Sequence, residues 1–121
     1  MIVISEKTAR CLVSPADAID AVAFAFQGVS RHQVLNFPVV RERLVPGPDV
    51  YGIKSGSALD GNLLGLKIGG YWIGNSARNL TNHQSTTVLS DPATGRPLAL
   101  ISSNYLTGLR IAAACAQRAH S

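Results

Sequence analysis

The sequence has few of the residues that mark several common classes of protein. Its two cysteines, Cys11 and Cys115, lie far apart, so neither a disulfide framework nor a zinc site is predicted, and no histidine pair has metal-ligand spacing. No stretch approaches the roughly 18–20 apolar residues that cross a bilayer, and residues 1–6 do not resemble an export signal. We therefore expect a soluble, cytoplasmic protein with reduced thiols and without a metal or a membrane partner.

Basic residues are in excess but are not clustered. The chain has 11 Lys and Arg against 7 Asp and Glu, a net charge of +4, and the basic residues do not form long runs. Nucleic-acid binding usually needs a basic stripe or patch, so no nucleic-acid partner is expected. The 121 residues, 46% of them apolar, are enough for one globular domain, which we place at residues 1–121.

Two helix start signals lie near the N-terminus. Residues 1–4 form a short apolar run typical of a strand, and Ser5 is suited to cap a brief helix after it. Ser14 and Asp17 have the spacing of a capping box, so a second helix is predicted to start there and to end near Ser30. Its expected apolar stripe consists of Ile19, Val22, Ala23, Phe26 and Val29.

The central part of the chain has the pattern of short strands. Between residues 37 and 73, β-rich apolar segments alternate with turn sequences at 46–49 and 60–62, which predicts three or four strands. The connections are too short for helical crossovers, so the strands should be antiparallel. Residues 75–85 are polar and lack periodicity, and we interpret them as a loop.

The C-terminal part predicts one more hairpin and a final helix. Residues 86–89 and 97–102 flank a cluster of Pro, Asp and Gly that is typical of a hairpin loop. Ser103 or Asn104 is expected to cap a helix that continues through Ala119. Its expected apolar stripe consists of Leu106, Leu109, Ala113 and Ala116. This order of elements favours an α+β fold, with helices packed on a largely antiparallel sheet.

Lys67 is an unusual basic residue because it lies within the most apolar predicted strand, Leu63–Gly70. On an alternating strand it can simply face solvent. Alternatively, its ammonium group is partly dry and binds a carboxylate or acts as an acid or base. If it points into a cleft with Arg43 and Arg110, the three cations require an anion to relieve their repulsion.

Other residues also have both a structural and a functional interpretation. Arg110 borders the apolar stripe early in the last helix and can simply form a surface salt bridge. Alternatively it binds a phosphate or carboxylate, because the helix dipole disfavours a cation there unless an anion is bound as well. Arg43 alternates with Glu42 and shares one strand face with Arg41, and most such pairs are simply solvated. His83 either stabilises a loop or serves a site. The Gly52–Gly56 segment is rejected as a phosphate-binding loop, because such a loop opens a helix and strands follow here.

Four motifs occur together in the sequence and resemble those of one family. They are Gly65-Leu66-Lys67, Asn82-His83-Gln84, Asp91–Ala99 and Leu106–Ala114. Together with Arg43 they resemble the ornithine cyclodeaminase/μ-crystallin family. The resemblance implies an NAD(P)-dependent enzyme that acts on amino acids or cyclic imines. Cyclodeaminases of this family convert ornithine to proline with loss of ammonia, and relatives are imine reductases or amino-acid dehydrogenases.

The resemblance also implies roles for individual residues. The substrate arginine and lysine of the family fall on Arg43 and Lys67, so substrate binding is expected there. Its cofactor-contacting arginine falls on Arg110, and its cofactor-proximal histidine falls on His83. Asn82 stands where the family usually has threonine and can still donate a hydrogen bond. NAD or NADP is therefore expected to contact Asn82, His83 and Arg110, and no catalytic residue is assigned.

The sequence also departs from the family pattern. Ile111 stands where the family usually has a threonine that binds the cofactor, and the glycine-rich turn and later aspartate of the dinucleotide-binding domain do not occur. We therefore expect residues 1–121 to be the substrate-binding and dimerisation domain, truncated before the dinucleotide-binding domain. Such a chain should form a homodimer and be inactive alone. The alternative is a non-catalytic module that dimerises or binds a small carboxylate.

Overall fold

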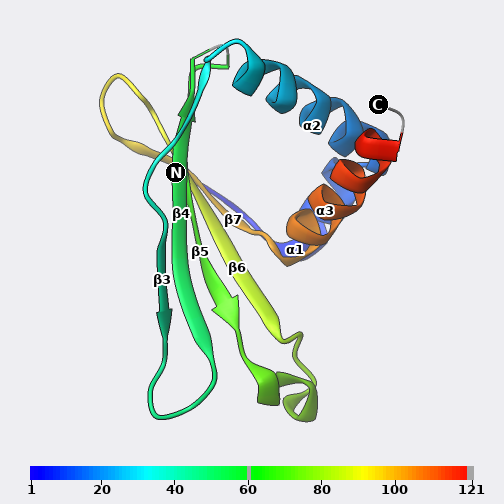
Figure 1. Cartoon of the computed structure of the whole chain (residues 1–121), viewed down its shortest axis with the longest axis vertical. Helices are drawn as coiled ribbons and strands as arrows, with labels where there is room; N and C mark the ends of the chain where they lie inside the picture. The colour runs from blue at the N-terminus through cyan, green and yellow to red at the C-terminus, as the bar shows by residue number, and fades with distance from the viewer. Residues whose placement is uncertain (60, 120–121) are drawn as a thin grey trace.

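The computed structural model describes residues 1–59 and 61–119, without the side chains of residues 26–29 and 116–119. The predicted α+β class is confirmed, with helices near both ends of the chain and strands between them (Figure 1). The elements in chain order are β1 (Ile2–Ile4), α1 (Glu6–Leu12), α2 (Pro15–Ser30), β2 (Val34–Asn36), β3 (Val40–Arg43), β4 (Val50–Ala58), β5 (Leu63–Tyr71), the 3-10 helix η1 (Ile73–Arg78), β6 (His83–Ser90), β7 (Pro97–Ser102) and α3 (Asn104–Ala119).

The strands of the described residues form one sheet of seven. Its order is β1-β7-β6-β5-β4-β2, and β3 also pairs with β4. All neighbouring strands are antiparallel except β1 and β7, which are parallel. The antiparallel strands predicted between residues 37 and 73 are therefore confirmed as β3, β4 and β5, and the predicted hairpin as β6 and β7. The predicted turn at 60–62 includes residue 60, which lies outside the described residues.

Both N-terminal helices begin at the predicted caps. Ser5 Oγ accepts a hydrogen bond from Thr8 N at 3.2 Å at the start of α1. Ser14 and Asp17 form a reciprocal capping box, with Asp17 N donating to Ser14 Oγ at 3.1 Å and Ser14 N donating to Asp17 Oδ2 at 2.9 Å. These hydrogen bonds stabilise the charged carboxylate and lower the pKa of Asp17.

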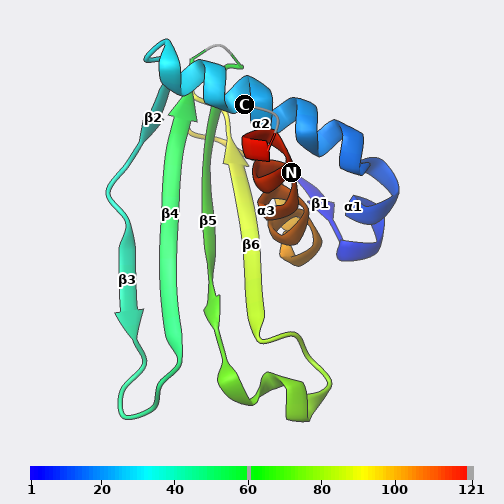
Figure 2. The same cartoon turned by 45° about the vertical axis from the view of Figure 1, so that its right-hand side comes forward.

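The helices lie together on one side of the sheet (Figures 1 and 2). Their described core contains Ala18 and Val22 of α2 and Ala113 of α3, with Leu109 packed against them. The predicted stripe of α2 is wrong in part, because Ile19 is 39% exposed and Ala18 is buried instead. The buried stripe differs because α2 packs on α3 rather than flat on the sheet. The predicted stripe positions 26, 29 and 116 have side chains outside the described residues.

None of the described helices is both long enough and apolar enough to span a membrane.

The prediction that residues 75–85 form a loop is wrong in part. It contains most of η1, and β6 already begins at His83. Asn75 is 6% exposed, and its side chain donates to Thr81 O at 2.9 Å and accepts from Arg78 Nη1 at 3.1 Å. The order of this segment thus comes from hydrogen bonds of polar side chains, which hydrophobic periodicity does not detect.

The predicted final helix is confirmed as α3, but Glu6 caps it in place of Ser103 or Asn104. Asn104 N and Tyr105 N, at the start of α3, donate to the two carboxylate oxygens of Glu6 at 2.7 and 3.0 Å. The side chain of Asn104 instead accepts from Ser85 N at 2.7 Å, and Ser103 Oγ donates to Ile101 O at 2.9 Å. A carboxylate at a helix N-terminus satisfies free backbone donors and complements the helix dipole.

Replacing Glu6 with alanine is expected to reduce the free energy of unfolding by about 1–2 kcal/mol, because two charge-assisted hydrogen bonds to α3 are lost. Urea denaturation followed by circular dichroism measures this change. Glu42→Ala removes an exposed carboxylate of β3 and serves as the control. Equal stability of the two variants would contradict a role of Glu6 in holding α3.

Candidate functional site

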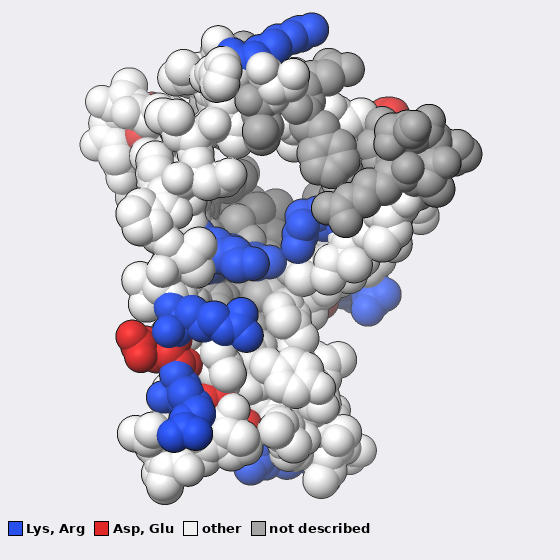
Figure 3. Space-filling view, viewed as in Figure 1, with Lys and Arg blue, Asp and Glu red and all other residues white. Residues whose placement is uncertain are grey.

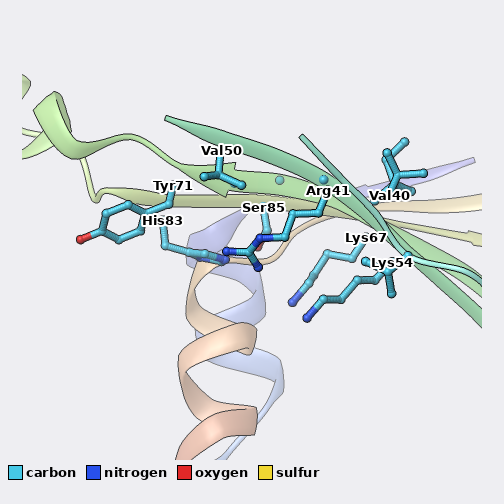
Figure 4. A pocket seen from close by; sticks show the side chains of 13 residues that line it. Val40, Arg41, Val50, Lys54, Lys67, Tyr71, His83 and Ser85 are labelled. Atoms are coloured by element: carbon cyan, nitrogen blue, oxygen red, sulfur yellow. The ribbon is translucent and has the colours of Figure 1, made fainter. Parts of the chain in front are cut away.

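A cavity of about 230 Å³ lies on the sheet over β3, β4, β5 and β6. Its polar lining residues include Arg41, Lys54, Lys67, His83 and Ser85. Figure 4 shows the side chains of Arg41, Lys54, Lys67 and His83 extending from the sheet toward the side on which α3 lies. We call this side of the sheet the site face. Figure 3 shows basic side chains along the lower edge of a hollow between the sheet and the helices, and further ones below it.

Strand register brings the cationic residues of the cavity together. Lys54 of β4 pairs directly with Lys67 of β5. Arg41 of β3 pairs with Gly52 of β4, two residues before Lys54. Residues that are paired across strands, or two apart along one strand, have side chains on the same face of a sheet. Arg41, Lys54 and Lys67 therefore share the site face.

Glycines form the floor of the cavity. Gly52 pairs with Gly69, so no side chain occupies this position on either β4 or β5. A Cβ atom on Gly69 would lie 2.2 Å from the backbone oxygen of Gln84, and one on Gly52 would lie 2.6 Å from that of Val40. These contacts are shorter than any real Cβ contact, so the backbones approach closely only because both residues are glycine. The glycine pair leaves space beside the lysines.

Lys67 points toward α3 and not into open solvent. Its amine donates a hydrogen bond to Thr107 Oγ1 at 3.3 Å, and Thr107 Oγ1 lies 3.3 Å from Ser85 Oγ. Burial lowers the pKa of Lys67, and the positive charges of Arg110 and Lys54 lower it further. Thr107 is a neutral partner, so its hydroxyl orients the ammonium group without balancing its charge.

His83 lines the same cavity at the start of β6. Burial lowers its pKa below the ordinary value of 6.5, and the nearby charges of Lys67 and Lys54 act in the same direction. The imidazole is therefore neutral at pH 7. A neutral imidazole can donate one hydrogen bond and accept another.

The structure places the predicted residues in different positions. Lys67 and His83 line the cavity, whereas Arg43 does not, although it pairs with Val50 on the site face. Arg110 is exposed on α3, close enough to Lys67 to affect its pKa. Asn82 Oδ1 accepts from Ser76 N at 3.1 Å, and its Nδ2 donates to Tyr71 Oη at 3.3 Å.

Sequence reasoning missed Arg41 and Lys54 as cavity residues. Arg41 shares the strand face of Arg43, and this alternation was the available signal. Lys54 lies within the Gly52–Gly56 segment, whose pattern does not fit a phosphate-binding loop and gives no other functional signal. Its pairing with Lys67 depends on the register of β4 and β5, for which the sequence carried no direct signal.

The arrangement is suited to bind an anion. Among the described lining residues there are three cations and no carboxylate. A carboxylate or phosphate in the cavity would relieve the repulsion between the cations. No aspartate or glutamate of the described lining is available as a general acid or base.

The proposed cofactor residues fit only part of a dinucleotide. The exposed guanidinium of Arg110 suits a negatively charged group, and the neutral imidazole of His83 suits a polar one. The Asn82 amide is already engaged within its own segment. The 121 residues contain no glycine-rich turn that would hold a pyrophosphate.

Known proteins share both the sequence and the fold of this chain. Iminosuccinate reductase of Paracoccus denitrificans (strain Pd 1222) is 46% identical over 116 residues, which are 96% of this chain and 36% of the relative. The crystal structure of the iminosuccinate reductase of Paracoccus denitrificans in complex with NAD+ superposes with a TM-score of 0.90, again at 46% identity and with the same coverage.

A more distant structure has the same fold. It is the Δ1-pyrroline-2-carboxylate reductase of Thermococcus litoralis in complex with NADH and L-proline, with a TM-score of 0.91 and 23% identity. The superposition covers 95% of this chain and 36% of that protein. The chain thus spans little more than a third of the length of these relatives.

The extent of the match to a whole family settles the classification. The sequence model of the ornithine cyclodeaminase/mu-crystallin family matches residues 10–120, which is nearly the whole chain. Lys67, His83 and Arg110 all lie within the matched region. The chain therefore belongs to the ornithine cyclodeaminase/mu-crystallin family.

Proposed function

We propose that this chain forms the substrate-binding part of an NAD(P)-linked imine reductase that acts on imino acids. The observation that carries this proposal is the environment of Lys67. Its partly buried ammonium group contacts a neutral hydroxyl, in a cavity whose described lining is cationic and lacks carboxylates. The carboxylate of an imino acid provides the missing negative charge.

Reduction of an imine fits the charge of the cavity better than the conversion of ornithine does. Ornithine carries a second ammonium group, which Arg41, Lys54 and Lys67 would repel because the described lining offers no carboxylate to receive it. The relative that is 46% identical is an iminosuccinate reductase. Both points favour a substrate with a carboxylate and an uncharged or weakly basic imine.

The cavity residues then have separate roles. Lys67 and Arg41 bind the substrate carboxylate, and Thr107 holds the Lys67 amine toward the cavity. We assign to Arg41 the role that the family resemblance implied for Arg43, because Arg41 lines the cavity and Arg43 does not. His83 offers a neutral hydrogen-bonding group beside the substrate.

Cofactor contact and self-association belong to the same proposal. Asn82, His83 and Arg110 are the proposed contacts with NAD or NADP, which when bound supplies the hydride that reduces the imine carbon. We also propose that residues 1–121 act as a substrate-binding and dimerising domain.

A chimera tests this proposal. Residues 1–121 are joined to the part of the Paracoccus denitrificans reductase that follows its similarity to this chain. We expect this protein to oxidise NADH with at least one α-keto acid in the presence of ammonium, because these components form imino acids in solution. The 121-residue chain alone is expected to oxidise no NADH, because its sequence lacks the turn that binds the pyrophosphate.

The chimera carrying Lys67→Met is the matched control and should lose most of this activity. NADH binding is measured separately by fluorescence, which shows whether the chimera has folded. A chimera that binds NADH but reduces none of the imines would contradict the proposal. Carboxylate binding without reduction would instead support the non-catalytic binding module.

A further inference from the structure

The proposed function leaves Lys54 without a role. Lys54 and Lys67 are direct partners on neighbouring strands, and both line the cavity. Directly opposed residues of antiparallel strands have Cβ atoms about 4.5–5.5 Å apart, and like charges in such positions destabilise a sheet. Figure 4 shows both lysine side chains extending to the same side. A bound anion would offset the repulsion between these two lysines.

The positive charge of the cavity lining is larger than one carboxylate can balance. Arg41, Lys54 and Lys67 carry three positive charges, while His83 is neutral at pH 7. The described lining residues include no Asp or Glu that would balance them. One carboxylate therefore leaves two positive charges uncompensated, and two carboxylates leave one.

The two lysines also offer separate binding positions. The Lys67 amine is held on the α3 side by Thr107 Oγ1. Lys54 lies on β4, one strand farther from β6, and is exposed. The side-chain-free pair Gly52 and Gly69 lies next to both lysines and provides room for a ligand that reaches from one to the other.

We propose that Lys54 binds a second carboxylate, so that the substrate of this site is a dicarboxylic imino acid. This inference rests on the proposed function, because it takes Lys67 and Arg41 as the residues that bind the first carboxylate. Lys54 is then the residue that distinguishes dicarboxylic from monocarboxylic substrates.

Calorimetric titration of the 121-residue chain with succinate and butyrate tests this assignment. The two ligands have the same number of carbon atoms and differ by one carboxylate. We expect succinate to bind more tightly than butyrate. Lys54→Met should weaken succinate binding about tenfold, the size of one charge-assisted contact, and change butyrate binding less than about twofold. Lys54→Arg should retain the preference for succinate.

Lys7→Met is the matched control, because Lys7 is an exposed lysine of α1 outside the cavity lining. Binding of both ligands should be unchanged in this variant. If Lys54→Met weakens both ligands equally, or neither, the inference is overturned. The inference would also be overturned if inorganic phosphate bound more tightly than succinate and this binding depended on Lys54, because the site would then recognise a compact anion. If Lys67→Met does not change the affinity for either ligand, the proposed function itself is contradicted.

Discussion

Replacing Lys67 with methionine is expected to weaken carboxylate binding by about 2–4 kcal/mol, or about 30- to 1000-fold. The ammonium group is partly buried and is oriented by Thr107, so a bound carboxylate would gain a charge-assisted contact in a partly dry site. Methionine has a similar length but no charge. Calorimetric titration of the chain with succinate measures the loss. An unchanged affinity would remove Lys67 from the site.

The same variant should change the pH dependence of the protein. Burial, Arg110 and Lys54 lower the pKa of Lys67 below its ordinary value of 10.5. Between the lowered pKa and 10.5, the unfolded chain binds more protons at this position than the folded chain. The free energy of unfolding should therefore rise with pH in this window, and carboxylate binding should weaken as the ammonium loses its proton. In Lys67→Met, the contribution of residue 67 to both pH effects should disappear.

Gly69→Ala is expected to reduce the free energy of unfolding by about 3 kcal/mol, near the upper end of the range for overpacking. The new Cβ atom would lie 2.2 Å from Gln84 O and 2.9 Å from Ser85 Cβ, so the backbones of β5 and β6 would have to separate. Movement of β6 would also displace Ser85 and His83, and carboxylate affinity should fall as well. Urea denaturation and succinate titration measure the two effects.

Gly108→Ala is the matched control for this substitution. A Cβ atom on Gly108 would meet no atom within 4 Å, and the residue is an exposed position of α3. Alanine in a helix interior is favoured over glycine, so this variant should be more stable by about 0.5–1 kcal/mol. A Gly69→Ala protein as stable as the unmodified chain would show that the two strands do not need their close approach.

Local signals in the sequence account for most of the secondary structure. The capping box of Ser14 and Asp17 and the turn-forming residues between strands act within a few residues of the elements they define. The cap of α3 could not be predicted in this way, because Glu6 is 98 residues from Asn104 in the chain. The 3-10 helix η1 was missed because buried Asn75 orders it by hydrogen bonds rather than by apolar contacts.

Of the residues that line the cavity, the sequence singled out Lys67 and His83. Lys67 stands out because a lysine in an apolar strand is unusual, and it does line the cavity. The contributions of Lys54 and Arg41 depend on which residues face each other across three strands. Register is set by the sheet as a whole, and a shift of one residue would have placed these side chains on the opposite face.

The bond between Glu6 and the start of α3 also bears on the order in which the protein is assembled during synthesis. Glu6 leaves the ribosome early, but its backbone partners at residues 104 and 105 are made 98 and 99 residues later. Strand β1 likewise can pair with β7 only after β7 has been synthesised. Contacts between such distant segments form slowly because a long loop must close first. Thr107, which orients Lys67, follows only two residues after Tyr105, so the Lys67 amine gains this hydrogen-bond partner only after the chain has been synthesised beyond the start of α3.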